Sequence, residues 1–422
     1  MISKLFNCSL VDVVSGKIKT NTTIIVNDGK ISYVGEESGA PRAPYDLEYD
    51  CTSSFLMPGF FDLHTHISYD GTLKSHSIEV AATEDPGYRA IKAYNEAKKH
   101  LDTGFTTIRD CGSLMFEDIS VRNAVNANVI PGPNIYATGK PLSITGGHGD
   151  RRTNAMSSVP SIGLISNGAD EMRYNTRYLI RQGVDWIKIF GSGGVSSEGD
   201  KPDQTQYTID ELRASVSEAH AAGRKVAVHA HGKEAIANAV QAGVDTIEHG
   251  TMIAENPDLL MNMKEGNIGL IPNLCTPNFI VKRGSEVMTE SAIAKATVVI
   301  DLRVQTVKLA KEAGIKIALG TDSGLAVRHD ESAYEFLYLK KAGLSDLEAI
   351  QAGTISAAQI LGKEAETGSL EIGKVADMVL VSKNPFEGVE YLTDHKNIKG
   401  VFRRGVLQNS CPDHEGSFVK FQ

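Results

Sequence analysis

The chain has 422 residues, 41% of them hydrophobic, and 43 lysines and arginines against 52 aspartates and glutamates give a formal net charge of −9. This acidic balance argues against nucleic acid or an anionic membrane as a partner, and no stretch has the roughly 18 consecutive apolar residues of a membrane span. Five scattered cysteines without a Cys-x-x-Cys pair, and a beginning without the apolar core of a signal peptide, predict a reducing, cytoplasmic location.

The first 57 residues are predicted to form short β-strands. Leu10–Val14 and Thr23–Val26 are β-prone runs separated by polar residues. Asn27-Asp28-Gly29 is a strong signal for a hairpin turn before the next run. This part of the chain is therefore predicted to be a small all-β unit.

From residue 58 to residue 365, apolar strand-like runs alternate with helical stretches. Thr208-Ile-Asp-Glu211 and Ser345-Asp-Leu-Glu348 are capping boxes that open helices, and a single helix is expected over Ser345–Leu361. The alternation predicts a parallel sheet, and eight runs predict an α/β fold that closes into a (β/α)8 TIM barrel. The runs are Phe60–His66, Thr106–Cys111, Ile135–Thr138, Trp186–Phe190, Val226–His231, Thr246–His249, Leu270–Leu274 and Ile315–Gly320.

After the last predicted helix, Gly368–Val381 and Gly400–Leu407 again have the residue pattern of β-strands. The simplest interpretation is that both chain ends build one domain. We therefore predict a small β-sandwich domain made of residues 1–57 and 366–422, beside a barrel made of residues 58–365.

The ends of the predicted strands carry the rare residues, and in such a barrel the chemistry lies at the C-terminal ends of the strands. His64 and His66 end the first run, and because side chains alternate along a strand, both imidazoles can reach one metal ion. Neutral imidazole suits zinc and related ions. Four more runs end in or carry further candidates, so the pattern predicts a metal centre; these candidates are Lys188, His229, His231, His249 and Asp322.

Lys188 interrupts an otherwise apolar run, Trp186–Phe190. A solvated or ion-paired lysine is the alternative interpretation, and its position in mid-barrel disfavours it. A second metal needs a bridging anionic ligand, which lysine provides only if CO2 converts its amine to a carbamate.

Together these motifs resemble the amidohydrolase superfamily. Pro58-Gly-Phe-Phe-Asp-Leu-His-Thr-His66 and Gly373-Lys-Val-Ala-Asp-Met-Val-Leu380 carry the resemblance at the two ends of the barrel. Within the superfamily the chain is similar to the metal-dependent dipeptidases and carboxypeptidases related to imidazolonepropionase, which include Xaa-Pro dipeptidases and Xaa-Arg carboxypeptidases. Their Leu-Ser-x-Thr-Gly-Gly-His-x-Asp segment is Leu142–Asp150 here.

The resemblance implies two divalent metal ions, with zinc the first expectation. His64, His66 and Asp322 would bind the more buried ion, and His229 and His249 the second. Carboxylated Lys188 would bridge them. The first histidine of His229-Ala-His231 is the usual ligand, which leaves His231 as a substrate contact. In prolidases of this group, the position that corresponds to His231 is typically tyrosine. The histidine found here therefore favours the carboxypeptidase branch.

The implied reaction is attack on an amide by a hydroxide held between two metals about 3.5–4 Å apart. Asp322 would take its proton and pass it to the leaving amine, while His231 would stabilise the oxyanion or bind the carboxylate of the leaving amino acid. His148 and Arg151, with neighbouring Arg152, are candidates for that carboxylate, although an exposed loop charge is the favoured interpretation of the arginines. Tyr207 either lines the pocket or only staples the start of a helix.

The expected function is hydrolysis of dipeptides or N-acyl amino acids with a free C-terminal carboxylate, of the Xaa-Pro or Xaa-Arg/Lys type, with an aromatic leaving residue also open. The alternative is an imidazolonepropionase-like cyclic amidase or a deaminase, which typically uses one metal and lacks a lysine on the fourth strand. A non-enzymatic scaffold would be expected to have lost a ligand, and none is lost here. A small-molecule or dipeptide substrate and further copies of the chain in a homo-oligomer are the expected partners.

Overall fold

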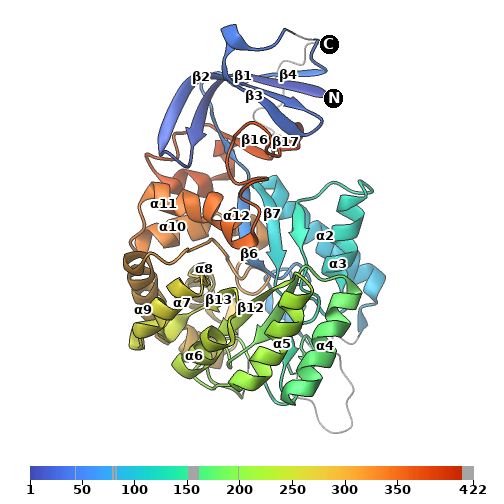
Figure 1. Cartoon of the computed structure of the whole chain (residues 1–422), viewed down its shortest axis with the longest axis vertical. Coiled ribbons are helices and arrows are strands. Elements are labelled where there is room, and N and C mark those ends of the chain that lie inside the picture. Colours follow the sequence, from blue (N-terminus) through green and yellow to red (C-terminus); the bar gives the residue numbers. More distant parts are fainter. Residues whose placement is uncertain (43, 78–79, 81–82, 151–160, 198, 411–422) are drawn as a thin grey trace.

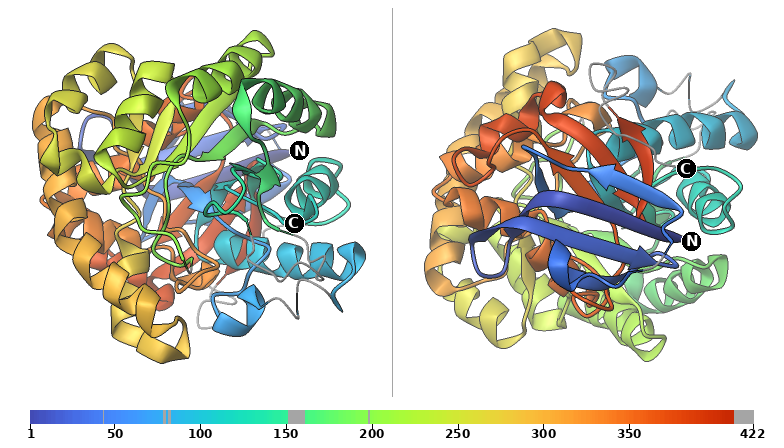
Figure 2. Two further views of the ribbon diagram at one scale, coloured as in Figure 1. Left: turned by 90° about the horizontal axis from the view of Figure 1, so that it is seen from below. Right: turned by 90° about the horizontal axis from the view of Figure 1, so that it is seen from above.

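The computed structural model describes residues 1–42, 44–77, 80, 83–150, 161–197 and 199–410. It has a barrel surrounded by helices and a sheet that lies across one end of the barrel (Figure 1). Figure 2 shows strands from the two ends of the chain together in that sheet. Within the described ranges, no helix is long and apolar enough to cross a membrane.

One mixed sheet contains strands from both ends of the chain. They are β1 (Ile2–Asp12), β2 (Lys17–Asn27), β3 (Lys30–Glu36), β4 (Leu47–Asp50), β5 (Phe55–Pro58), β15 (Met378–Val381), β16 (Ile398–Arg403) and β17 (Val406–Ser410). The strand order is β17-β16-β15-β5-β1-β2-β3, with β4 beside β1. The two chain ends meet where β5 runs antiparallel to β15, with Met57 opposite Val379. The expected union of both ends is confirmed, while the boundaries at residues 57 and 365 stay a prediction.

The hairpin predicted at Asn27-Asp28-Gly29 joins β2 to β3. Asn27 is paired with Lys30, so Asp28 and Gly29 are the two residues of the loop. Their φ angles are 48° and 81°, which is the left-handed pair that a type I′ turn requires. The predicted turn is confirmed.

Parallel strands build the wall of the barrel, and seven of the predicted runs are present. The seventh run ends early, because Pro272 has no N–H to donate and Asn273 adopts φ 51°. The short strands β9 (Leu142–Ser143) and β10 (Leu164–Ile165) extend the wall beside the fourth run. The seven strands are β6 (Phe60–Thr65), β7 (Phe105–Asp110), β8 (Asn134–Tyr136), β11 (Trp186–Phe190), β12 (Lys225–Ala230), β13 (Thr246–His249) and β14 (Gly269–Ile271).

The eighth predicted strand, Ile315–Gly320, forms no continuous ladder with its neighbours. Ile317 makes an isolated bridge to Leu270 of β14, and the carbonyl of Leu319 accepts from Leu63 of β6. The N–H of Leu319 instead donates to the carbonyl of Ala352 in a helix, which interrupts the ladder. The run still links β14 to β6, so the barrel closes.

Eleven helices of the described chain flank the strands. Both predicted capping boxes are present, at Thr208 and at Ser345. The single helix predicted over Ser345–Leu361 is wrong: two helices meet at Gly353, whose carbonyl accepts from Phe61 of β6 and therefore cannot continue a helix. The helices are α2 (Pro86–Asp102), α3 (Glu117–Asn126), α4 (Gly168–Gln182), α5 (Ile209–Ala221), α6 (Lys233–Ala242), α7 (Asp258–Glu265), α8 (Cys275–Arg283), α9 (Glu290–Ala313), α10 (Tyr334–Lys341), α11 (Asp346–Ala352) and α12 (Ile355–Leu361).

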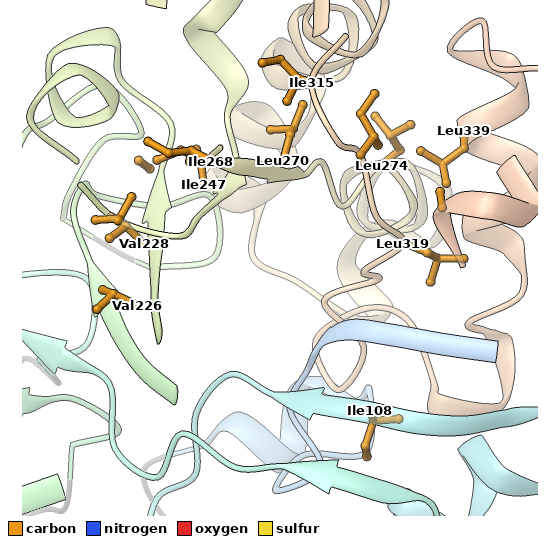
Figure 3. Packing of buried hydrophobic residues seen from close by; sticks show 14 of the residues in the cluster. Ile108, Val226, Val228, Ile247, Ile268, Leu270, Leu274, Ile315, Leu319 and Leu339 are labelled. Carbon is orange, nitrogen blue, oxygen red and sulfur yellow. The ribbon is translucent and has the colours of Figure 1, made fainter. Parts of the chain in front are cut away.

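The main core lies between the strands and these helices, and Figure 3 shows part of it, with Val226, Val228 and Ile247 from neighbouring strands. Gly59, just before β6, donates its N–H to the carbonyl of Asp377 beside the mixed sheet. The amino ends of the barrel strands therefore face the sheet. Their carboxyl ends open at the opposite end of the barrel.

Candidate metal centre

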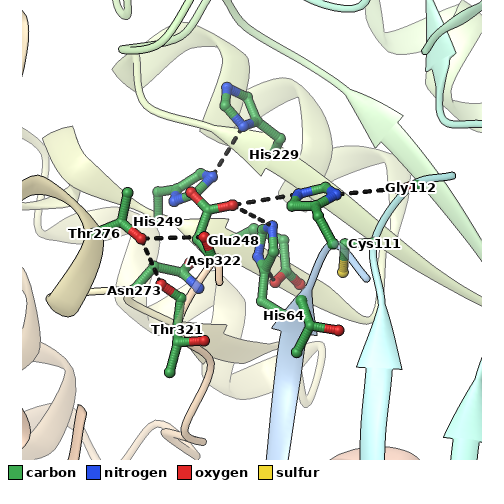
Figure 4. A network of polar contacts seen from close by, with 12 residues as sticks. His64, Cys111, Gly112, His229, Glu248, His249, Asn273, Thr276, Thr321 and Asp322 are labelled. Carbon is green, nitrogen blue, oxygen red and sulfur yellow. Dashed lines mark hydrogen bonds and ion pairs between the residues drawn. The ribbon is translucent and has the colours of Figure 1, made fainter. Parts of the chain in front are cut away.

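The carboxyl ends of the barrel strands surround a cavity of about 630 Å³. Two sets of side chains at its base each place ligand atoms within 4.8 Å of one another: His64 with His249 and Asp322, and His229 with His231 and His249. Figure 4 shows four of these side chains, those of His64, His229, His249 and Asp322, close to one another. The cavity is lined by the predicted residues His64, His66, His148, His229, His231, His249 and Asp322.

Glu248 fixes the ring of His64. Nδ1 of His64 lies 2.8 Å from Oε2 of Glu248, and fully buried Arg109 donates to Oε1 at 2.7 Å. Burial alone would raise the pKa of Glu248, but Arg109 and His64 hold it well below its usual range. The carboxylate therefore accepts, so Nδ1 carries the hydrogen and Nε2 keeps its lone pair. Burial, followed by the nearby Lys188 ammonium, lowers the pKa of His64 to about 4, which keeps the ring neutral.

His66 has the same arrangement. Its Nδ1 donates to the carbonyl of Gly112 at 3.2 Å, which leaves a lone pair on Nε2. The Nε2 atoms of His64 and His66 lie 3.5 and 3.3 Å from Oδ1 of Asp322. Burial alone would raise the pKa of Asp322, but the attraction of its neighbours lowers it, so the group is a carboxylate. Three electron-rich atoms thus face one another, an arrangement that a cation among them would stabilise.

His229 and His249 face each other beside this cluster. Nε2 of His229 lies 3.1 Å from the carbonyl of Gly193 and donates to it, so Nδ1 keeps a lone pair. That Nδ1 lies 2.9 Å from Nε2 of His249. The Nδ1 atom of His249 is buried and has no partner among the described residues. The two imidazoles lie close enough to share one ion, and Nδ1 of His249 has no competing partner among the described residues, so the pair is a candidate for a second metal position.

Two of the rim residues adopt left-handed backbone conformations. His249 has φ 69° and Asp322 has φ 59°, a region that residues other than glycine seldom adopt. Each residue ends a barrel strand or run, so this conformation turns its side chain toward the cavity. Such strain is typical of functional positions.

Lys188 on β11 is completely buried. Its Nζ lies 3.5 Å from Nε2 of His64, and the described chain gives it no carboxylate partner. An ammonium has three donors to satisfy, so one long contact leaves this buried group poorly compensated. A carbamate at the same position would present oxygens to the electron-poor centre of a metal pair. The donor set of the site therefore fits divalent metal ions.

Cys111 lies close to His64 and Glu248. Its thiol contacts the carbonyl of Leu63 at 3.7 Å, and burial raises its pKa to about 12. A neutral thiol is a poor metal ligand. This supports the interpretation of Cys111 as a buried filler.

His231 differs from the four histidines of the two metal positions, because its Nδ1 lies 2.7 Å from a hydroxyl, that of Thr251. Thr251 already accepts a hydrogen bond from Nε of Arg303 at 3.2 Å. The hydroxyl hydrogen of this buried threonine therefore goes to Nδ1 of His231, since otherwise it would be left unpaired. Nε2 of His231 then carries the hydrogen, so the ring presents a donor to the cavity and is not suited to bind metal.

Most of the chain matches one enzyme family. The match to the amidohydrolase family covers residues 55–407, which includes the barrel and most of the C-terminal strands. The chain belongs to the amidohydrolase family. The predicted resemblance is thereby confirmed, and the protein is a hydrolase of this family.

Named amidohydrolases are similar over almost the whole chain. Ochratoxinase of Aspergillus niger is 31% identical over 413 residues, which are 93% of this chain and 84% of that protein. The crystal structure of a prolidase in complex with N-methylphosphonate-L-proline has a TM-score of 0.89 and 30% identity, and covers 97% of this chain and 100% of that one. A Xaa-Pro dipeptidase with methionine bound in its active site gives a TM-score of 0.87 at 30% identity, with the same coverage of both chains.

The predicted substrate contacts of this amidohydrolase have different outcomes. His148 lines the cavity, where its ring stacks on that of His229 with centroids 4.5 Å apart and its Nδ1 lies 2.8 Å from the hydroxyl of Ser197. Tyr207 does not line this cavity: its side chain lies in the main core and its hydroxyl donates to the carbonyl of Ser166 at 3.0 Å. The prediction of a pocket contact for Tyr207 is therefore corrected. Arg151 and Arg152 lie outside the described residues.

Sequence reasoning missed Arg303, which reaches the cavity from the middle of α9. The residue is 2% exposed, and burial lowers its pKa to about 10, so the guanidinium is charged at neutral pH. A lone arginine in a long helix gives no sequence signal of such a position. Glu248 and Arg109 were also missed as the residues that orient His64.

Proposed function

We propose that the protein is a binuclear metal-dependent hydrolase that cleaves the amide bond of dipeptides or N-acyl amino acids with a free C-terminal carboxylate. The observation that carries the proposal is that Nε2 of His64 and Nε2 of His66 face Oδ1 of Asp322, at 3.5 and 3.3 Å. The relatives named prolidase, Xaa-Pro dipeptidase and ochratoxinase support an amide substrate.

Two positions would hold divalent ions, with zinc as the first expectation. When bound, the ions supply an activated water as nucleophile and polarise the scissile carbonyl. Lys188, as a carbamate, would bridge the two positions. The residues of the first position are His64, His66 and Asp322, and those of the second are His229 and His249.

The chain's own residues then move protons and stabilise charge. Asp322 accepts a proton from the attacking water and passes it to the leaving nitrogen, which departs as the free amine of the amino acid. Nε2–H of His231 donates to the carbonyl oxygen as negative charge develops on it. Glu248 keeps His64 in the tautomer that binds metal.

The first experiment measures metal content per chain on freshly purified protein, together with hydrolysis of Xaa-Pro, Xaa-Arg and N-acyl aromatic amino acid substrates. Close to two ions per chain with release of a free amino acid is the expected result. Close to one ion without peptide cleavage would favour the imidazolonepropionase-like cyclic amidase or deaminase.

Lys188→Met tests the bridging role, because methionine keeps the length of the side chain without an amine. The variant should lose at least one of the two ions. A carbamate carbon should also be visible by ¹³C NMR after incubation of the native protein with ¹³C-bicarbonate, and absent from the variant. Full metal content in Lys188→Met would remove Lys188 from the centre.

A further inference from the structure

We propose that Arg303 binds the carboxylate of the substrate, and that the amino acid that carries this carboxylate has an apolar side chain. The inference rests on the proposed function and narrows it to a substrate class. Three features of the cavity support the proposal. They are the unsatisfied hydrogen-bonding capacity of the Arg303 guanidinium, its connection to His231 through Thr251, and the apolar wall of the cavity.

Two of the three nitrogens of the Arg303 guanidinium are held by the protein, and the third, Nη2, is not. Nη1 donates to the carbonyl of Asn273 at 2.6 Å and Nε to the hydroxyl of Thr251 at 3.2 Å. Nη2 has no hydrogen-bond partner among the described residues, although the side chain is almost completely buried and lines the cavity. Buried arginines are normally paired with an anion. Asp322 and Glu335 attract the guanidinium, but no salt bridge to it is present among the described residues, so the free Nη2 is assigned to the carboxylate of the substrate.

The place of Arg303 suits the carboxylate of a leaving amino acid. In an α-amino acid the carboxylate is separated from the scissile nitrogen by one carbon, so its binding group must lie beside the catalytic groups. Thr251 makes this connection, because its hydroxyl contacts both Arg303 and His231. The group that binds the carboxylate and the group that donates to the scissile carbonyl are thus held by one threonine.

The cavity wall beside Arg303 is apolar. Pro277 and Ile280 on α8 line the cavity, and Ile280 packs with Ala296 of α9 in one buried cluster, with Leu325 against it. A basic side chain would need a carboxylate in this part of the wall, and Pro277, Ile280 and Leu325 offer none. The wall therefore favours a leaving residue such as phenylalanine, leucine or proline over arginine or lysine.

Calorimetric binding to the freshly purified protein tests the assignment without turnover. The probes are L-phenylalanine, L-leucine, L-proline and L-arginine, each with its primary amide. We expect each apolar amino acid to bind at least about tenfold more tightly than its amide, and L-arginine to bind more weakly than the apolar ones. Equal binding of acids and amides would overturn the role of Arg303, and tightest binding of L-arginine would overturn the apolar class.

Arg303→Met should remove the preference for acid over amide, and Arg283→Met is the matched control. Arg283 donates to the carbonyl of Ala326 and pairs with Glu331, and it does not line the cavity. If Arg303→Met does not fold, Arg303→Lys is the alternative variant, because lysine keeps the positive charge without the planar guanidinium. This variant should bind the free amino acids more weakly and bind their amides with unchanged affinity. Retention of the full preference in the Arg303 variant would contradict the proposal. A protein that hydrolyses no peptide yet shows this preference would overturn the proposed function and leave the carboxylate site standing.

Discussion

Oε2 of Glu248 lies 2.8 Å from Nδ1 of His64, and this contact decides which nitrogen of His64 is free for a metal. Glu248→Gln keeps the shape and removes the charge that also pairs with buried Arg109. We expect the free energy of unfolding to fall by about 3–5 kcal/mol, because an unpaired buried guanidinium remains, and metal affinity to weaken about 10–100-fold. Urea unfolding and metal titration measure both effects.

The exposed pair of Glu218 and Arg177 provides the control for this prediction. Glu218→Gln should change stability by no more than about 1 kcal/mol and leave metal affinity unaltered. Equal losses of stability and metal affinity in Glu248→Gln and Glu218→Gln would mean that the buried position of the Glu248–Arg109 pair does not increase its contribution.

Asp322→Asn tests proton transfer. The amide keeps an oxygen for the metal but is a much weaker base, so kcat should fall about 10²–10⁴-fold while most of the metal is retained. Steady-state kinetics and metal analysis of the same preparation are the measurements. Asp150→Asn, a change in a carboxylate that lines the same cavity, is the control and should keep most activity. A near-native rate in Asp322→Asn would exclude Asp322 from the proton-transfer step.

Gly324 lies where the chain leaves the metal centre. Its φ is +98°, and a Cβ there would come within 2.3 Å of the carbonyl oxygen of His66. Gly324→Ala should therefore displace His66 and reduce metal content. Gly373→Ala is matched to it, with φ +91° but no atom within 4 Å of the added Cβ, so it should lose about 1–2 kcal/mol from backbone strain alone and keep its metal. Equal metal content in both variants would contradict the prediction that close packing of Gly324 against the backbone of His66 positions this ligand.

His100 and His329 form a buried pair in which Nε2 of His100 lies 2.8 Å from Nδ1 of His329. Burial lowers the pKa of both, and the partner ring lowers that of His100 further. Because these values lie below the unfolded value near 6.5, the unfolded chain takes up protons first. The free energy of unfolding should therefore reach its full value above about pH 6.5. At lower pH it should decrease, by up to about 1.4 kcal/mol per pH unit for each ring.

Urea midpoints at pH 7, 6 and 5 check this, with His100→Gln as the variant. The variant should be less stable at pH 7 and lose less on acidification than the native protein. His395→Gln, a change in an exposed histidine, should keep the native pH profile. An unaltered slope in His100→Gln would show that the pair does not control acid stability.

The sequence was sufficient to predict the site residues whose positions depend on local periodicity. His64, Lys188 and His229 lie in short strands, where alternation along a few residues decides which way a side chain points. The inward direction of Arg303 instead depends on the packing of α9 against α8 and on carbonyls distant in the chain, such as that of Asn273. The break at Gly353 arises in the same way, because its carbonyl is needed by Phe61 of a strand made much earlier.

The pairing of β5 with β15 has a consequence for synthesis of the protein. During translation, β5 is made long before residues 378–381 exist, so one edge of it stays open for on the order of tens of seconds at ribosomal speed. An open strand edge is a template for association with other chains. Nascent chains that stop before β15 therefore carry an unprotected apolar strand, and we expect premature termination there to yield aggregates rather than a shortened enzyme.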